Sequence, residues 1–483
     1  MSSNQFSDNN TASVLCVDLD GTLIHTDTIW ESVLLFLKKQ PLGVFSLLFW
    51  LFKGRAYLKD ALARQVSLDV SLLPFHEDFL VFLKQQKAEG RKIVLVTASH
   101  QQVAEQVAAW TGLFDEVIGS TLSCNLKGRQ KADCLVKKFG AKNFDYAGNE
   151  WPDMKVWRVA RRAIVVNASS FVLRAAQRHF EVSHVFHLPQ SKVKTWLRAL
   201  RSHQWIKNVL LFTPLIAAHH WLSLEGWLAA GMAFVSFSLF TSSVYVFNDL
   251  FDLEADRHHY RKKNRPFAGG HLQIYQGLIV IPLLFAGGVL TSLALPPAFL
   301  ACGCAYYFAS AAYSLRLKQI EVLDVLVLAG LYTIRIIAGA YAVGVTLSFW
   351  MLAFAVFLFL SLGLMKRFAE LKDLRRQNKE SAKGRGYLTS DLEQISSLGA
   401  ASGYVAALVL ALYLNSKEVS AIYHQPQILW GLCVLLLYWI NRVWLLAHRG
   451  KMHEDPVIFT LTDKTSYAIA AAGLLLVALA RPL

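Results

Sequence analysis

The sequence predicts two fold classes in one chain: an α/β doubly wound, Rossmann-like soluble domain with a helical cap, then an all-α polytopic membrane domain of about nine transmembrane helices. Charged residues occur throughout residues 1–205, whereas apolar runs recur from about residue 209 onward. In the first part, short apolar runs alternate with helical segments, which is typical of a parallel sheet covered by helices. In the second part, runs of about 20 apolar residues are long enough to cross a bilayer core of ~30 Å.

The composition agrees with a chain that lies partly in a membrane. Of its 483 residues, 54% are hydrophobic and 17% are charged, which is more apolar than a soluble globular protein. The net charge of +15 fits both basic cytoplasmic loops and an anionic substrate. Because the basic clusters stand between apolar runs, nucleic acid is not expected as a partner. The six cysteines include no CxxC pair and no spacing typical of a zinc site.

The first predicted element is a buried strand at residues 13–19, SVLCVDL. Residues 1–11 precede it and are expected to be disordered; they lack the basic region and apolar core of a signal peptide. The soluble domain is therefore expected in the cytoplasm. The strand runs into DLDGT, where Asp18 and Asp20 stand at i and i+2 and project from the same face.

Two further apolar runs predict strands at residues 91–99 and 162–169, the second being the last strand expected in this domain. In a doubly wound sheet, ligands bind at the carboxyl ends of the strands. The polar residues that follow these strands or begin a helix are Thr97, Lys131, Asn149 and Asp153. They predict a binding site beside DLDGT.

At these residues the chain resembles the haloacid dehalogenase-type phosphatase superfamily, over residues 12–190 and with the cap at about residues 25–75. The resemblance implies that Asp18 is the nucleophile that attacks phosphorus and that Asp20 is a general acid/base. A carboxylate can attack a phosphoryl group once a metal ion and a lysine screen its charge. The resemblance also implies two binding sets, Thr97 and Lys131 for the phosphoryl group and Asp18, Asp20 and Asp153 for Mg²⁺.

The metal-binding loop departs from the pattern of that superfamily. It often reads GDxxxD, but here it reads GNEWPD, so that Asn149 is neutral where a second carboxylate is common. Because the nucleophile and the acid/base residue are both present, an active phosphatase is the favoured interpretation. The alternative is a degenerate domain that serves packing or regulation.

The run PLGVFSLLFWLF, residues 41–52, lies inside the expected cap. It is too short to span a bilayer. It could belong to the core of the cap, or it could contact the bilayer or the second domain. The sequence leaves these alternatives open.

Nine transmembrane spans are expected from the apolar runs. They lie at residues 208–223, 227–247, 274–295, 297–313, 323–343, 346–365, 397–415, 427–447 and 466–481. Basic residues crowd alternate loops, at residues 194–207, 257–265, 315–318, 366–385 and 442–451. Lys and Arg collect in cytoplasmic loops, so we expect a multi-pass inner-membrane protein whose N-terminal domain is cytoplasmic.

The stretch VYVFNDLFDLEADRHHYRKKNRP, residues 244–266, follows the second span. Within it, Asn248, Asp249, Asp252 and Asp256 stand at i, i+1, i+4 and i+8, which places them on one face of a helix. Like charges this close repel one another, and a divalent cation removes the conflict. Oxygen ligands indicate Mg²⁺. The alternative interpretation is a solvated helix end beside a basic loop that determines topology.

NDLFDLEADR fits NDxxDxxxD, the first signature of the UbiA superfamily of intramembrane prenyltransferases, and the resemblance covers residues 195–483. Their second signature is another aspartate-rich motif after the fourth span. Here that region, residues 313–325, has only Glu321 and Asp324 as acids. It looks like the decaprenyl-phosphate phosphoribosyltransferase branch, and so do residues 201–215 and 332–342.

The resemblance implies a reaction in which phosphoribosyl pyrophosphate is the donor and a polyprenyl phosphate is the acceptor. Asp249 and Asp252 would be catalytic, and Mg²⁺ on Asn248, Asp249, Asp252 and Asp256 would neutralise the leaving diphosphate. The residues expected to bind the two substrates are Lys207, Asn208, Arg257, Lys262, Arg265, Tyr313, Lys318, Lys366 and Arg367.

The presence of both halves in one chain suggests a joint hypothesis, in which the membrane half makes a lipid-linked 5-phosphoribose and the phosphatase half removes its 5-phosphate. Two alternatives stay open. One is a prenyltransferase that moves a prenyl group from its diphosphate to an aromatic or other acceptor. The other is a non-catalytic protein that binds or transports an isoprenoid lipid and retains a relict phosphatase domain.

Overall fold

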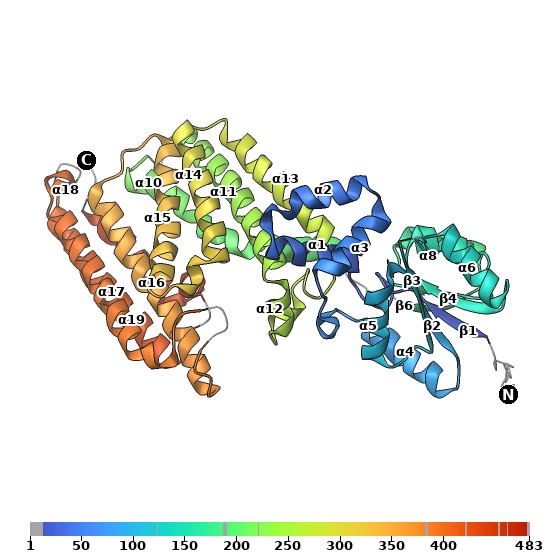
Figure 1. Cartoon of the computed structure of the whole chain (residues 1–483). Coiled ribbons are helices and arrows are strands. Elements are labelled where there is room, and N and C mark those ends of the chain that lie inside the picture. The colour runs from blue at the N-terminus through green and yellow to red at the C-terminus, as the bar shows by residue number, and fades with distance from the viewer. Residues whose placement is uncertain are drawn as a thin grey trace, which may run out of the picture. The chain divides into compact units, whose positions relative to one another are not determined.

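The computed structural model describes residues 13–122, 124–186, 191–220, 222–381, 385–420, 423–452, 455–460 and 462–480 (Figure 1). The segment 1–11, which was expected to be disordered, lies outside them. Contacts divide the chain into two compact units. The first consists of Met1–Leu200 with Val246–Val280, and the second of Arg201–Tyr245 with Ile281–Leu483. The first unit thus includes the NDxxDxxxD segment besides the expected soluble domain.

A six-stranded parallel sheet forms the centre of the first unit, in the order β3-β2-β1-β4-β5-β6. The strands are β1 (Val14–Val17), β2 (Ile93–His100), β3 (Glu116–Ser120), β4 (Phe144–Gly148), β5 (Ala163–Val166) and β6 (Val182–Phe186). The predicted α/β doubly wound class is confirmed. The prediction that residues 162–169 form the last strand is wrong, because β6 follows it. At the edge of the sheet β6 buries little, and VSHVF therefore lacks an apolar run.

Alternate residues of the strands face two different helical layers. Leu15 and Val17 point into one core with α4 (Glu77–Ala88) and α5 (Gln101–Thr111). Cys16, between them, points into the opposite core with α6 (Arg129–Phe139) and α8 (Ser170–His179). This two-sided burial explains why the strands read as continuous apolar runs.

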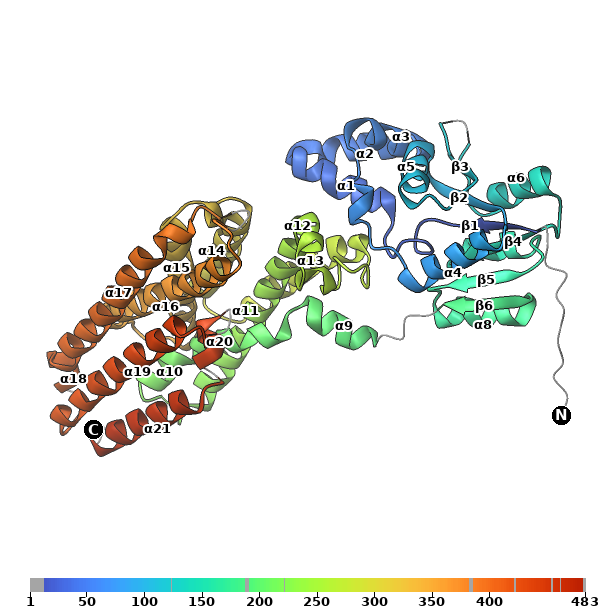
Figure 2. The same cartoon turned by 90° about the horizontal axis from the view of Figure 1, so that it is seen from below.

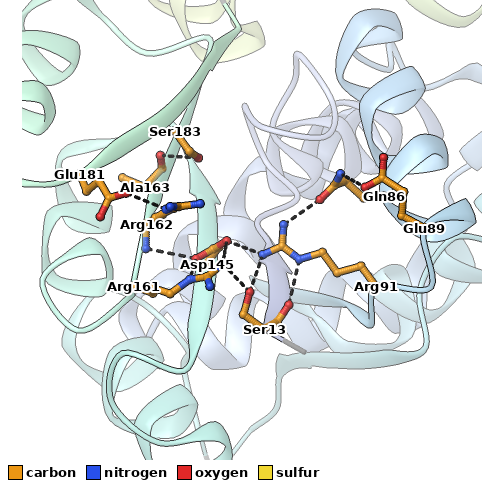
Figure 3. Close-up of polar contacts among 10 residues, drawn as sticks. All are labelled: Ser13, Gln86, Glu89, Arg91, Asp145, Arg161, Arg162, Ala163, Glu181 and Ser183. Atoms are coloured by element: carbon orange, nitrogen blue, oxygen red, sulfur yellow. Dashed lines mark hydrogen bonds and ion pairs between the residues drawn. The ribbon is translucent and has the colours of Figure 1, made fainter. Parts of the chain in front are cut away.

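The amino-terminal edge of the sheet is held by one buried carboxylate, Asp145 of β4 (Figure 3). Its side chain is 4% exposed and accepts hydrogen bonds from Arg161 Nε (3.0 Å) and Arg161 Nη2 (2.9 Å), and another from Arg91. Both guanidinium groups also donate to Ser13 Oγ, just before β1. Burial alone would raise the pKa of Asp145, but the hydrogen bonds from Arg161 and Arg91 outweigh it and hold the pKa below its usual range.

The expected cap contains three helices, α1 (Thr28–Lys39), α2 (Val44–Phe52) and α3 (Arg55–Gln65), which lie together in both views (Figure 2). Their shared core is formed by Val33, Phe36, Leu58, Leu62 and Val66. The side chain of Asp27 accepts a hydrogen bond from Ile29 N–H and so caps α1.

Seven of the described helices are long and apolar enough to cross a membrane. They are α11 (Leu224–Phe251), α13 (Ile274–Ser292), α14 (Pro297–Leu315), α15 (Leu323–Val343), α16 (Phe349–Arg376), α17 (Leu392–Leu414) and α19 (Trp430–His448). Shorter α-helices are α7 (Met154–Trp157), α9 (Lys192–Ala199), α10 (Thr213–Ala217), α12 (Leu253–His258), α18 (Lys417–Ser420), α20 (Pro456–Thr460) and α21 (Lys464–Leu479). The 3₁₀ helices are η1 (Pro41–Gly43), η2 (Val70–Leu72), η3 (Trp151–Asp153), η4 (Ser202–Phe212), η5 (Lys262–Asn264), η6 (Leu317–Gln319), η7 (Thr389–Asp391) and η8 (Pro426–Leu429).

Two of the nine expected spans differ in the structure. The run 208–223 is not one helix, because η4 gives way to α10 near Pro214 and the chain turns at His219, whose φ is 59°. The last expected span corresponds to α21, whose 16 residues extend only about 24 Å as an α-helix. The expected count of nine therefore includes two segments that are short for a bilayer.

Small residues bring helices of the second unit close together. A side chain at Gly339 of α15 would collide with the backbone of Leu211 in η4. A side chain at Gly399 of α17 would collide with the indole of Trp444 in α19. Close packing of this kind is typical of membrane helices, because lipid tails are as apolar as the helix surfaces and the hydrophobic effect does not drive association.

Candidate active sites

The carboxyl ends of β1, β2 and β4 meet at one edge of the sheet, because β1 pairs with both of the other strands. Asp18 follows β1 directly, and its N–H donates to Ala147 O of β4 (3.0 Å). Thr97 lies in β2, where the register with β3 shifts between Val96 and His100. This edge carries the predicted phosphatase site.

Lys131 and Asp18 form the centre of this site. Lys131 lies in the first turn of α6 and is 2% exposed, and its Nζ donates to Asp18 Oδ2 (2.9 Å) and Tyr146 Oη (2.8 Å). The Tyr146 hydroxyl donates in turn to Asp153 Oδ1 (2.9 Å). The structure thus joins Asp18, Lys131 and Asp153, all three of them predicted, through a tyrosine that the sequence interpretation missed.

The ionisation of these groups follows from their burial and charge. Burial raises the pKa of Asp18 to about 7, although Lys131 opposes the shift. Burial would lower the pKa of Lys131, but the carboxylates of Asp18 and Asp153 outweigh it and raise the pKa. Lys131 therefore stays cationic and places a positive charge beside the carboxylate of Asp18.

Asp20 lies on the cap side of this site. Its Oδ1 accepts a hydrogen bond from Thr28 N–H at the start of α1 (2.9 Å), and its Oδ2 accepts one from the Ser99 hydroxyl. Thr97, also predicted, accepts a hydrogen bond from Ser99 N–H through its Oγ1 (3.0 Å). Ser99 therefore links Asp20 to Thr97; it escaped prediction because a serine at the end of a strand has no distinctive pattern.

The loop GNEWPD keeps Asp153 oriented although Asn149 is neutral. Asp153 Oδ2 accepts hydrogen bonds from the N–H groups of Asn149 (3.0 Å) and Glu150 (2.9 Å). Asn149 Oδ1 accepts a hydrogen bond from the Thr22 hydroxyl (3.2 Å), which ties this loop to DLDGT. Among the described residues, no group of three His, Cys, Asp or Glu side chains lies close enough together to hold a metal ion by itself. The oxygen donors suit Mg²⁺ bound by a few carboxylates together with a substrate phosphate.

The NDxxDxxxD segment forms a second cluster. Helix α11 ends at Phe251, and α12 begins after Asp252. The N–H of Asp252 donates to Asn248 O (2.8 Å), and the N–H of Asp256 donates to Asp252 O (2.8 Å), so the helical i to i+4 pattern continues across the break. The backbone spacing on which the predicted shared face depends is thereby kept although the helix is interrupted.

Asp249 and Asp256 are both 2% exposed and share one cation. Arg265 Nη1 donates to Asp249 Oδ1 (3.2 Å) and to Asp256 Oδ2 (2.6 Å). Burial raises the pKa of Asp256, and Arg265 opposes the shift. The Oδ1 atom of Asn248 is buried and has no hydrogen-bond partner. A buried amide oxygen beside two carboxylates fits an oxygen-ligated Mg²⁺, for which Asn248 would supply a neutral ligand.

Two other residues predicted to bind substrate lie elsewhere in the first unit. Arg257 forms a buried bidentate ion pair with Glu31 of α1, at 2.6 and 3.1 Å. Glu31 also accepts a hydrogen bond from the Thr26 hydroxyl (2.7 Å). Lys262 lies in η5 with an exposed side chain. Arg257 is therefore held by the cap. This contact joins residues 226 positions apart and could not be predicted from a local pattern.

In the second unit, Asp324 and Arg367 form a fully buried ion pair at 2.5 Å. Tyr387 donates to the other oxygen of Asp324 (2.7 Å). Arg367 donates to Tyr313 Oη (2.7 Å), and Arg385 donates both to Tyr313 Oη (3.0 Å) and to Lys318 O (3.4 Å). Three of the predicted residues, Tyr313, Lys318 and Arg367, therefore belong to one polar network.

Two more predicted residues of the second unit, Lys207 and Lys366, share the carboxylate of Asp455. Lys207 forms a hydrogen-bonded ion pair with Asp455, and Lys366 Nζ lies 3.8 Å from the same carboxylate. Burial would raise the pKa of Asp455, but Lys366 and Lys207 outweigh it and lower the pKa. Asp455 was missed because it lies 248 positions from Lys207 in a segment without a motif.

Asn208 lies beside a buried arginine within the helices of the second unit. Arg335 of α15 is 3% exposed, and it donates to Asn208 Oδ1 (3.0 Å) and to Tyr306 Oη (2.9 Å). Asn208 Nδ2 donates to Ser238 Oγ (3.0 Å). An ionisable group at this depth is costly and is usually functional, so Arg335 joins the candidate residues.

Comparison with known proteins identifies both halves. The model of the UbiA prenyltransferase family matches residues 209–463, more than half of the chain. The chain belongs to the UbiA prenyltransferase family. The model of the haloacid dehalogenase-like hydrolases matches residues 15–148, so the N-terminal part is a domain of that type.

Relatives of this UbiA-family protein are similar to it over different shares of the chain. An uncharacterized protein, y4nM, of Sinorhizobium fredii is 36% identical over 95% of this chain and 89% of its own length. Nodulation protein NoeC of Azorhizobium caulinodans is 35% identical over 56% of this chain and 88% of its own. Decaprenyl-phosphate phosphoribosyltransferase of Mycobacterium tuberculosis is 35% identical over 38% of this chain and 62% of its own length.

Family membership and the seven long apolar helices together make this a multi-pass membrane protein. The haloacid dehalogenase-like half supplies the DLDGT cluster, and the UbiA half supplies NDxxDxxxD together with the cationic networks of the second unit. The chain is therefore a UbiA-family transferase with an appended hydrolase-type domain.

Proposed function

We propose that this protein transfers 5-phosphoribose from phosphoribosyl pyrophosphate to a polyprenyl phosphate, and that its N-terminal domain then removes the 5-phosphate from the lipid product. The similarity to decaprenyl-phosphate phosphoribosyltransferase supports this choice of substrates. The alternative, transfer of a prenyl group from its diphosphate, is the reaction that the family name describes.

One observation carries the choice between the two donors. A transferase with two aspartate-rich motifs needs free carboxylates in the second motif. Here Asp324 is fully buried and bound by Arg367 and Tyr387, so both of its oxygens are engaged. The network also holds the carboxylate of Glu370, which pairs with Arg367 and Arg385, so its acidic groups are bound by arginines and tyrosines. This pairing favours phosphorylated substrates over a second metal site.

The proposed transfer uses Asn248, Asp249, Asp252 and Asp256 to hold the diphosphate of the donor through Mg²⁺, which lowers the charge that the leaving diphosphate must carry. Arg265 bridges two of these carboxylates and would supply positive charge beside the leaving diphosphate. An oxygen of the lipid phosphate bonds to the anomeric carbon as the bond to diphosphate breaks. The lipid phosphate is already an anion and needs no general base.

The proposed dephosphorylation uses Asp18 as the nucleophile. One carboxylate oxygen of Asp18 bonds to phosphorus while the ester oxygen leaves and takes a proton from Asp20. Water then cleaves the aspartyl phosphate and releases inorganic phosphate, with Asp20 accepting its proton. Lys131 neutralises the phosphoryl oxygens in both steps. Positive-inside counting places both reactions on the cytoplasmic side of the inner membrane in this proposal.

The substrate assignment is tested by incubating purified protein with a polyprenyl phosphate and, in separate reactions, labelled phosphoribosyl pyrophosphate or labelled prenyl diphosphate with an aromatic acceptor. We expect label in lipid only from phosphoribosyl pyrophosphate. Label from prenyl diphosphate alone would establish the prenyltransferase instead. If label enters neither product, or if Asp249→Asn leaves turnover intact, the membrane half is not acting as this transferase, and lipid binding or transport becomes the better account.

A further inference from the structure

The cap of the hydrolase-type domain carries a large exposed apolar surface that neither proposed reaction uses. Helix α2 and the preceding η1 present it, and none of the nine residues of α2 is buried. Leu42 is 82% exposed, Phe45 73% and Phe52 89%. The other members of this surface are Val44, Leu48, Phe49 and Leu51. Seven exposed apolar side chains gathered within eleven residues indicate an interaction site.

The opposite face of α2 is packed, so the helix has a defined orientation. Leu47 and Trp50 pack against the core of the cap, and Trp50 lies 5.0 Å from Phe36 between ring centroids. Gly43 lets the chain approach Phe36 closely before the helix begins. Since the inner face anchors the helix, the outer aromatic side chains are held outward. The inner face of α2 therefore belongs to the core of the cap, and the outer face is left for another contact.

The charge around this surface indicates what covers it. Residues 40–55 contain no acidic side chain, and exposed Lys39, Lys53 and Arg55 flank the two ends of α2. Lys53 Nζ lies 4.6 Å from the centre of the Phe49 ring and 5.0 Å from that of Tyr57. Aromatic and aliphatic side chains on one face, with lysine and arginine at its rim, are typical of helices that lie in the headgroup region of a bilayer.

We propose that α2 docks the cap onto the membrane, in the plane of the bilayer, with Phe45, Phe49 and Phe52 in the acyl boundary and Lys53 and Arg55 on anionic headgroups. A helix of nine residues is too short to cross a bilayer but long enough to lie on one. The described part of the same chain includes seven helices long and apolar enough to span a membrane, so a lipid surface is always present at high local concentration.

Docking would also give the phosphatase site access to lipid-linked substrates, an extension that rests on the proposed function. Thr28, the first residue of helix α1, donates its N–H to Asp20. Helices α1 and α2 of the cap share one core. Holding α2 in the headgroup layer would therefore hold the cap side of Asp20 near the level where a polyprenyl-linked phosphate lies.

The docking is tested on the full chain in vesicles of phosphatidylcholine and phosphatidylglycerol that contain a lipid with a photoreactive acyl chain. After irradiation and digestion, mass spectrometry should find lipid adducts on the peptide of residues 41–52, as on the membrane spans. Phe171 of α8 is the control, because it is 65% exposed on the same unit and should carry none. The variant Phe45→Asp/Phe49→Asp should lose the adducts on α2 and keep those on the spans.

The proposal is overturned if the α2 peptide is labelled no more than the Phe171 peptide, or if the double variant keeps its adducts. A photoreactive amino acid at position 49 separates the other occupants: cross-links to protein instead of lipid would mean that a second copy or another part of the chain covers α2. This readout needs no catalysis.

In an added assay, the double variant should lose activity on a vesicle-bound phosphate ester and keep it on a soluble one. If wild-type protein hydrolyses neither ester, the proposed phosphatase activity is refuted, and the labelling result still decides whether α2 docks on the membrane.

Discussion

Replacing Asp145 by asparagine removes the buried charge that holds two arginines at the amino-terminal edge of the sheet. The substitution keeps the shape of the side chain but leaves Arg91 and Arg161 facing a neutral amide. Their own side chains are 11% and 32% exposed, so Arg161 can partly return to water, whereas Arg91 cannot. The effect reaches the active site indirectly, because β1 and β4 carry Asp18 and Asn149 at their other ends.

The magnitude follows from the burial of this carboxylate. Removing one partner of a buried ion pair costs about 3–5 kcal/mol, and the partial exposure of Arg161 places the cost near the lower limit, ~3 kcal/mol. For a unit of this size, the melting temperature falls by about 2–4 °C per kcal/mol, so a drop of roughly 6–12 °C is expected. The control is Glu181→Gln, which breaks the more exposed pair with Arg162 and should cost less than ~1 kcal/mol.

The assay is thermal unfolding of the full chain in detergent, with hydrogen exchange of peptides from β1 and β4 reporting on the first unit. The folded pKa of Asp145 lies below its unfolded value of 3.8, so its contribution is complete above that value and is lost as the pH falls through the folded pKa. The difference between wild type and variant should be constant from neutral to mildly acidic pH and shrink in stronger acid. A melting temperature like that of Glu181→Gln, or a difference that grows in acid, would refute this reasoning.

Three further predictions concern the two proposed sites. Asp249→Asn should lower transfer by about 10²–10³-fold, since it removes a carboxylate that would hold the Mg²⁺ on the leaving diphosphate. Hydrolysis of a soluble phosphate ester, and the transfer activity of Glu225→Gln at the other end of α11, should stay at wild-type levels. Asn149→Asp adds a carboxylate beside Asp153 and should lower the Mg²⁺ concentration that half-activates the phosphatase; an unchanged titration would mean that Asn149 does not face the metal. Asp324→Asn removes one of the two carboxylates that neutralise the buried Arg367, the other being Glu370, and should reduce the yield of folded protein without changing the Mg²⁺ requirement of transfer. A raised requirement would show that Asp324 is a metal ligand after all.

The hydrolase-type site could be predicted because its residues follow strand ends or begin a helix at one edge of the sheet. Parallel strands bring their carboxyl ends to one edge, so DLDGT, Lys131 and Asp153 were expected to meet, and the structure joins them. Tyr146 of β4 connects Lys131 to Asp153 through its hydroxyl. In the sequence it cannot be told from the other apolar residues of this buried strand. No local pattern distinguishes a tyrosine whose hydroxyl reaches a site from one that only packs.

The ion pairs could not be predicted, because their partners are far apart in the chain. Lys207 and Asp455 are separated by 248 positions, and Glu31 and Arg257 by 226. A basic residue after a membrane span looks the same whether it faces a substrate, a lipid headgroup or a distant carboxylate. Likewise, the apolar run 208–223 matched a span in composition, but the switch from η4 to α10 near Pro214 divides it.

The most direct test of the central claim uses phosphoribosyl pyrophosphate that carries one label in the ribose and another in the 5-phosphate. Purified protein converts it with a polyprenyl phosphate, and the two labels are counted in the lipid product. We predict that wild-type protein leaves the ribose label alone in the lipid, that Asp18→Asn keeps both labels in equal amounts, and that Asp133→Asn, an exposed change on α6, behaves like wild type. Equal retention of both labels by wild type and Asp18→Asn would contradict the claim that the two halves act in sequence on one lipid.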